Sequence, residues 1–119
     1  MTENRLEALR RKHELDCIAA ISDEGLVMAR AGGDEAMDAW AAYAPGVAQA
    51  GGRMAREGGL GGIRCSALIL STGRILMLHG TELAGHPGVI ALVGRRTPRG
   101  LNDMLEEIRA AVDAALGGG

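Results

Sequence analysis

Aromatic residues are nearly absent from this sequence: its 119 residues include no phenylalanine, one tryptophan (Trp40) and one tyrosine (Tyr43). The core must therefore be built from aliphatic side chains and methionines. Hydrophobic residues still make up 47% of the chain, which is enough for a single core. We expect one domain over residues 1–116 and a flexible glycine tail over residues 117–119.

The chain has neither a strong net charge nor a long apolar run. A net charge of −2 gives no basic surface of the kind that nucleic-acid binding requires. No apolar run approaches the length of a transmembrane helix, and the polar residues 1–12 do not resemble a secretory signal. We expect a cytoplasmic protein that neither binds nucleic acid nor inserts into a membrane.

Cysteine and histidine are also scarce and scattered. Cys17 and Cys65 lie in expected strands, where two buried thiols are more typical of a cytoplasmic protein than a disulfide. His13, His79 and His86 lie at a helix end, a strand end and a loop, without the spacing of a zinc site. The sequence predicts no metal site and no Cys–His nucleophile.

Glycine is abundant, but it does not form a phosphate-binding loop. None of the 19 glycines belongs to a Gly-Lys-Ser/Thr motif. Gly32-Gly33 lies between an expected strand and a helix, yet Asp34 would place negative charge where a phosphate should sit. Residues 58–62 are predicted to end a helix. We therefore expect no nucleotide cofactor and no enzymatic activity of the chain itself.

Short apolar runs bounded by turns predict five strands. Residues 17–22 and 26–31 flank Asp23-Glu24-Gly25, and two apolar runs within residues 63–79 flank Thr72-Gly73, as expected for two β-hairpins. Residues 89–93 form a fifth strand after a loop that contains Gly85, Pro87 and Gly88. The later runs do not alternate apolar with polar residues, so both faces of the sheet should be covered.

Three helices are expected to cover the sheet. The first follows Thr2, and the last has Thr97 as its cap, Pro98 at its first position and an apolar stripe that ends at Leu116. The second spans roughly residues 35–57 and should be kinked or broken near Ala44, because proline removes a helical hydrogen bond. Its expected core stripe is Met37, Trp40, Ala44, Val47, Ala48, Gly51 and Met54.

The opposite side of the second helix carries mostly small, uncharged residues, where a surface helix normally carries charge. No other segment of the chain remains to pack on this side, so we expect a partner subunit there. Trp40 lies on the core stripe, whereas Tyr43 lies on the partner side and is the better interface residue by type. The residues of this partner side are Ala36, Ala39, Tyr43, Gly46, Ala50 and Arg53.

The element order α-β-β-α-β-β-β-α, the segment Ile21-Ser-Asp-Glu-Gly-Leu-Val-Met-Ala29 and the strand-to-helix segment 89–116 resemble the roadblock (dynein light chain) family. The chain looks most like its compact bacterial members of the MglB/MglC type. The resemblance implies an α/β sandwich of the roadblock (longin/profilin-like) fold. In that fold a central five-stranded sheet carries the second helix on one face and the first and third helices on the other.

The resemblance also implies a homodimer that pairs second helices and joins sheets through the strand at residues 63–69. Ile63, Cys65 and Ala67 would then belong to the dimer interface. Family members bind Ras-like small GTPases or other roadblock chains in polarity and motility systems, and some stimulate GTP hydrolysis by their partner. The chain stops after its last helix, without the C-terminal extension of some MglB proteins, which favours an adaptor.

Four arginines are candidates for contact with a partner: Arg56 on the second helix, and Arg95, Arg96 and Arg99 in the turn before the last helix. The turn could supply an arginine finger to a GTPase. A simple solvated turn is the favoured interpretation, because charged clusters are usually exposed. Arg56 could equally be an ordinary cation near a helix C-terminus.

Three functions remain open. The first is a non-enzymatic dimeric adaptor or regulator that binds a Ras-like GTPase or a paralogous roadblock protein. The second is a GTPase-activating protein of the MglB type. The third is a small ligand-sensing domain, which is disfavoured because the sequence shows no polar groups converging on an apolar pocket.

Overall fold

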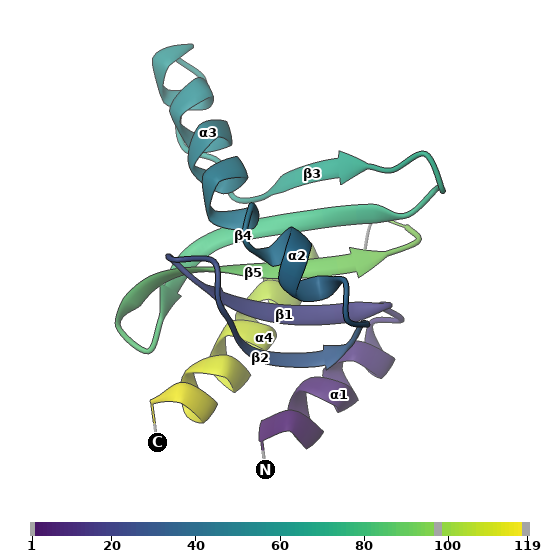
Figure 1. The fold of residues 1–119 in the computed structure, drawn as a ribbon. Helices are drawn as coiled ribbons and strands as arrows, with labels where there is room; N and C mark the ends of the chain where they lie inside the picture. Colours follow the sequence, from purple (N-terminus) through teal and green to yellow (C-terminus); the bar gives the residue numbers. More distant parts are fainter. Residues whose placement is uncertain (1, 97–98, 118–119) are drawn as a thin grey trace.

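The computed structural model describes residues 2–96 and 99–117, with side chains from residue 5 onward. Its centre is an antiparallel five-stranded sheet in the order β2-β1-β5-β4-β3 (Figure 1). The strands are β1 (Cys17–Ser22), β2 (Val27–Gly32), β3 (Ser66–Ile69), β4 (Ile75–Leu83) and β5 (His86–Gly94). The helices are α1 (Thr2–Lys12), α2 (Met37–Ala41), α3 (Ala44–Glu57) and α4 (Leu101–Leu116).

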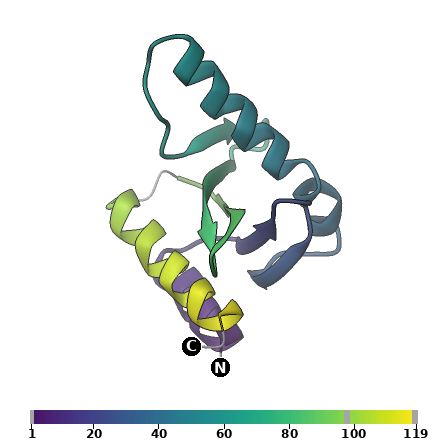
Figure 2. The same ribbon diagram turned by 90° about the vertical axis from the view of Figure 1, so that its left-hand side faces the viewer.

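Helices cover both faces of the central strands. Ile18 and Ile90 point to the face that α1 and α4 cover, while Ala19 and Ala91 point to the face that α2 and the start of α3 cover. Figure 2 shows α1 and α4 together on one side of the sheet and the second helical region on the other. The predicted sandwich, with its terminal helices on one face, is confirmed.

The strand β3 departs from this pattern. It lies at the edge of the sheet and pairs only with β4 within the chain. Ala67, Leu68 and Ile69 are exposed, so the expectation that both faces of this hairpin are covered is wrong for β3. Leu68 lies on the face that α3 leaves as it rises away from the sheet (Figure 1). Ala67 and Ile69 pair with Met77 and Ile75 and lie on the opposite face, the one that α1 and α4 cover over the central strands.

The connection between β4 and β5 is shorter than predicted. It consists of Ala84 and Gly85, both with positive φ, as in the two-residue hairpin turns that match the twist of a sheet. A carboxylate oxygen of Asp113 accepts a hydrogen bond from the Ala84 backbone at 2.9 Å, which holds this strained turn against α4. Pro87 and Gly88, expected in a loop, therefore lie in β5.

The second helical region is broken rather than merely kinked. α2 ends at Ala41 and α3 begins at Ala44, with Pro45 as its second residue. The first backbone N–H groups of a helix have no partner within it, so proline is tolerated there. Asp34, predicted to cap this region, accepts a hydrogen bond from the Ala36 backbone at 2.9 Å and shapes the turn just before α2.

The last helix starts later than predicted. It begins at Leu101, after Gly100 in the left-handed conformation. Thr97 and Pro98, the predicted cap and first residue, lie outside the described residues, as do residues 118–119 of the expected tail. In the described part of the chain, no helix has the length and apolar character needed to cross a bilayer.

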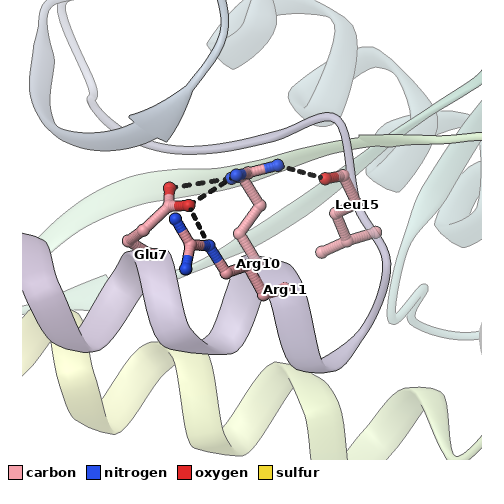
Figure 3. Close-up of polar contacts among 4 residues, drawn as sticks. All are labelled: Glu7, Arg10, Arg11 and Leu15. Carbon is pink, nitrogen blue, oxygen red and sulfur yellow. Dashed lines mark hydrogen bonds and ion pairs between the residues drawn. The ribbon is translucent and has the colours of Figure 1, made fainter.

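An ion-pair cluster fixes the end of α1 to the segment that leads into β1 (Figure 3). Arg10 donates hydrogen bonds to Glu7 at 2.8 Å and to the Leu15 carbonyl at 3.0 Å. Arg11 donates to the same carboxylate at 2.9 Å. The Arg10 hydrogen bond, followed by that of Arg11, lowers the pKa of Glu7 to about 2.

Acid should therefore weaken this contact. Because the pKa of Glu7 is depressed in the folded state, its stabilisation is complete above its ordinary value of 4.5 and is lost as the pH falls toward about 2. We expect the urea midpoint to fall over this range. Glu7→Gln should lower the urea midpoint at neutral pH and make the midpoint less sensitive to acid. If the midpoint of this variant falls with pH as steeply as that of the parent, the acid sensitivity comes from other carboxylates, such as Glu106 and Glu107.

Two methionines provide a matched test of the packing. Met104 on α4 is 0% exposed in the core, whereas Met28 on β2 is 39% exposed. Met104→Ala should destabilise the fold by about 2–5 kcal/mol, because it opens a cavity. Met28→Ala should cost about 1 kcal/mol or less. Chemical denaturation of both variants measures the difference, and similar losses would contradict this description of the core.

Candidate interaction surface

A large apolar surface lies along α3, the loop that follows it, and β3. Tyr43 is 76% exposed, Met54 70% and Leu60 78%. Monomeric proteins rarely leave so many large apolar side chains together in water, and such patches commonly mark interaction sites. We call this region the α3–β3 surface; its large apolar residues are Tyr43, Val47, Met54, Leu60, Ile63 and Leu68, while Ile69 pairs with Ile75 on the opposite face of the sheet.

The outward side of α3 follows a helical period. Residues 43, 47, 50 and 54 lie within a narrow arc, because steps of four and three residues return to the same side of a helix. The opposite side carries Ala44, Gly52 and Ala55, which are buried. These small residues let the start of α3 pack closely on the sheet.

Two residues of the predicted core stripe lie on the outward side instead. Val47 and Met54 were expected in the core, but both are exposed. The prediction continued one helical period through residues 35–57, whereas the break before Ala44 lets α3 turn its small residues inward. The other stripe residues behave as expected near the break: Met37 and Ala44 are buried, and Trp40 packs against the second core cluster.

The residues predicted to contact a partner subunit are accessible in the single chain. Ala36 and Ala39 are exposed at α2, and Tyr43, Gly46, Ala50 and Arg53 are exposed on α3. Ile63 and Ala67 are exposed, and Cys65 is half-buried.

The helix and the strand form one continuous surface. A side chain at Gly51 would meet the Ser66 hydroxyl at 2.7 Å and the end of Ile63 at 3.2 Å, so this glycine allows α3 to approach β3 closely. Figure 1 shows both elements at the same edge of the sheet, with α3 rising away from the start of β3. Beyond β3, the backbone edge of the sheet has no further strand from the described chain.

The four candidate arginines do not form one site. Arg56 lies on α3, and its guanidinium runs back over Gly52. Arg95, Arg96 and Arg99 lie beyond the end of β5, where Arg96 is 3.5 Å from Glu14, near the end of α1. All four are exposed.

The surroundings of the two cysteines, His13 and His79 indicate structural rather than catalytic roles. Burial raises the pKa of Cys17 to about 11 and also raises that of Cys65, so both remain protonated thiols at neutral pH rather than activated nucleophiles. The ring of His79 donates a hydrogen bond to the Arg64 carbonyl at 2.6 Å, and His13 lies 3.2 Å from Glu107. Within the described residues, no three side chains are arranged to hold a metal ion.

Comparison with known proteins identifies the fold. MglB from Myxococcus xanthus matches with a TM-score of 0.73 and 14% identity, over 99% of this chain and 96% of that one. A roadblock/LC7 domain from Streptomyces avermitilis matches with a TM-score of 0.70 and 22% identity, over 96% of this chain and 93% of that one. An MglB with a tetrameric arrangement matches with a TM-score of 0.67 and 19% identity, over 95% and 83%.

No family model matches the sequence, and no curated protein matches it significantly. At 14–22% identity the likeness is one of fold. The predicted roadblock fold, similar to that of MglB, is confirmed.

Proposed function

We propose that this protein is a roadblock-type, non-enzymatic adaptor or regulator that works as a dimer. The observation that carries the proposal is the exposed α3–β3 surface on a chain with the roadblock fold. An edge strand with exposed Leu68 and Ile69 would promote aggregation unless another chain covers it. A second copy that adds its own β3 and lays its α3 alongside would bury the apolar residues and pair the open edge.

Self-association through one patch requires a self-complementary surface. The mixture of small residues at Gly46 and Ala50 with large ones at Tyr43 and Met54 on the α3–β3 surface supports such a contact. Small residues let two helices approach, and the large side chains beside them can fill the remaining space. The tetrameric arrangement of a similar MglB supports assembly as a property of this fold.

A Ras-like small GTPase, a paralogous roadblock protein, or both are the partners we propose for the dimer, in a bacterial polarity or gliding-motility system of the cytoplasm. The likeness to MglB supports this assignment. The alternative is a GTPase-activating protein of the MglB type. Hydrolysis by the partner GTPase, measured with and without this protein, separates the two: an adaptor leaves the rate unchanged.

Gly46→Arg should convert the dimer into a monomer. A side chain at Gly46 meets no atom within 4 Å in the single chain, so arginine fits the fold but projects from the outward side of α3. Light scattering after size exclusion gives the mass. Tyr43→Glu should act in the same way, because it buries a charge in an apolar contact.

Ala110→Arg is the matched control, since Ala110 is exposed on α4, away from the α3–β3 surface. This variant should remain dimeric. If Gly46→Arg and Tyr43→Glu both keep the parental mass, the outward side of α3 does not form the interface.

A second prediction concerns the turn after β5. If it contacts a GTPase, Arg96→Glu should weaken binding about tenfold, because it puts like charge against an acidic partner surface. Binding to a GTPase loaded with a GTP analogue is measured by titration. The control is Arg30→Glu, an exposed arginine on β2 at the other edge of the sheet. If both variants bind the GTPase as tightly as the parent does, the arginines of this turn are solvated and do not contact the GTPase.

A further inference from the structure

A pocket of ≈ 300 Å³ lies beside α2, away from the outward side of α3. Its inner surface is apolar: Cys17, Met37 and Val93 are buried, and Trp40 and Leu76 are half-buried. Gly33 forms part of the wall with a φ of +81°. A side chain there would come within 2.4 Å of the end of Met37, so glycine keeps the backbone close to the pocket.

Three charged side chains from separate parts of the chain surround this apolar interior. Asp16 precedes β1, Asp34 precedes α2, and Arg74 precedes β4. The sequence prediction that no polar groups converge on an apolar pocket is therefore wrong. It failed because these residues meet only through the sheet order, which places the starts of β1 and β4 at one end of the sheet on either side of the end of β5.

The charges around the pocket favour a cation. Arg74 lies 3.8 Å from Asp16, which offsets one of the two carboxylates. One oxygen of Asp34 accepts a hydrogen bond from the Ala36 backbone, but a carboxylate has further acceptor positions. The pKa of Cys17, which also lines the pocket, is raised first by burial and then by Asp16, while Arg74 lowers it.

We propose that this pocket binds a small organic cation, an apolar ring that carries a primary ammonium group. The ring would contact Met37, Leu76 and Trp40, and the ammonium would lie beside the carboxylate of Asp34, which attracts it. The volume is at the low end of known ligand pockets, which indicates a small ligand. This site goes beyond the proposed adaptor function and does not depend on it.

The protein carries its own reporter for this site. Trp40 is the only tryptophan in the chain and lines the pocket, so its fluorescence responds directly to a bound ligand. Titration with phenethylamine, whose amine is protonated at neutral pH, should change the fluorescence with saturation at millimolar concentration. Hydrocinnamate has a carboxylate in place of the ammonium and should bind at least about tenfold more weakly.

Asp34→Asn tests the carboxylate without removing the turn. Asparagine keeps an oxygen that can accept the Ala36 hydrogen bond, but it carries no charge. This variant should bind phenethylamine about tenfold more weakly than the parent. Asp38→Asn is the matched control, because it removes the same charge from an exposed position on α2 that does not line the pocket; its affinity should equal that of the parent.

The outcomes separate clearly. Saturable binding that prefers the amine and weakens in Asp34→Asn supports the site. The absence of saturation by phenethylamine, an equal response to hydrocinnamate, or an equal loss in Asp38→Asn would each overturn it. The dimer mass is measured separately, so failure of the pocket proposal leaves the α3–β3 proposal standing, and failure of the dimer leaves this one standing.

Discussion

The burial of β1 and β5 from both sides is the constraint on which the other elements depend. Ile18 and Ile90 need one apolar layer, while Ala19 and Ala91 need another on the opposite face. The terminal helices α1 and α4 provide the first layer, although they are far apart in sequence. Both faces carry aliphatic residues: Ile18, Ile90 and Leu92 face this pair of helices, and Ile21, Val89 and Val93 lie with Ala19 and Ala91 on the face of α2. With no phenylalanine in the chain, this division of aliphatic side chains replaces the aromatic packing of other cores.

The break at Pro45 has the largest effect on the surface. A continuous helix over residues 35–57 would keep one stripe toward the sheet throughout, whereas the break lets α3 leave the sheet after a short contact through Ala44 and Ala48. The same departure exposes Met54 and leaves Leu68 of β3 partly uncovered. The exposure of Met54 and of Leu68 thus follows from the break at Pro45, which the sequence itself shows.

Local patterns predicted most of the fold. The bounds of β1 agree with its apolar run, and the Thr72-Gly73 turn forms as expected, with Gly73 at positive φ. The Ala84-Gly85 turn could not be predicted in this way, because alanine rarely adopts positive φ and is held there by Asp113 from α4. Of the outward side of α3, composition identified Tyr43 and the small residues, but it placed Val47 and Met54 in the core. The pocket beside α2 required tertiary proximity that no spacing reveals.

The weak attachment of α3 has a consequence for motion. Small side chains join this helix to the sheet, and the glycines at 58, 59, 61 and 62 connect it to β3. Elements with few buried apolar contacts open at low free energy, so backbone amides of α3 should exchange with solvent far sooner than those of β1 and β5. We therefore expect the central strands to be the most stable part of the molecule and α3 to open at lower free energy.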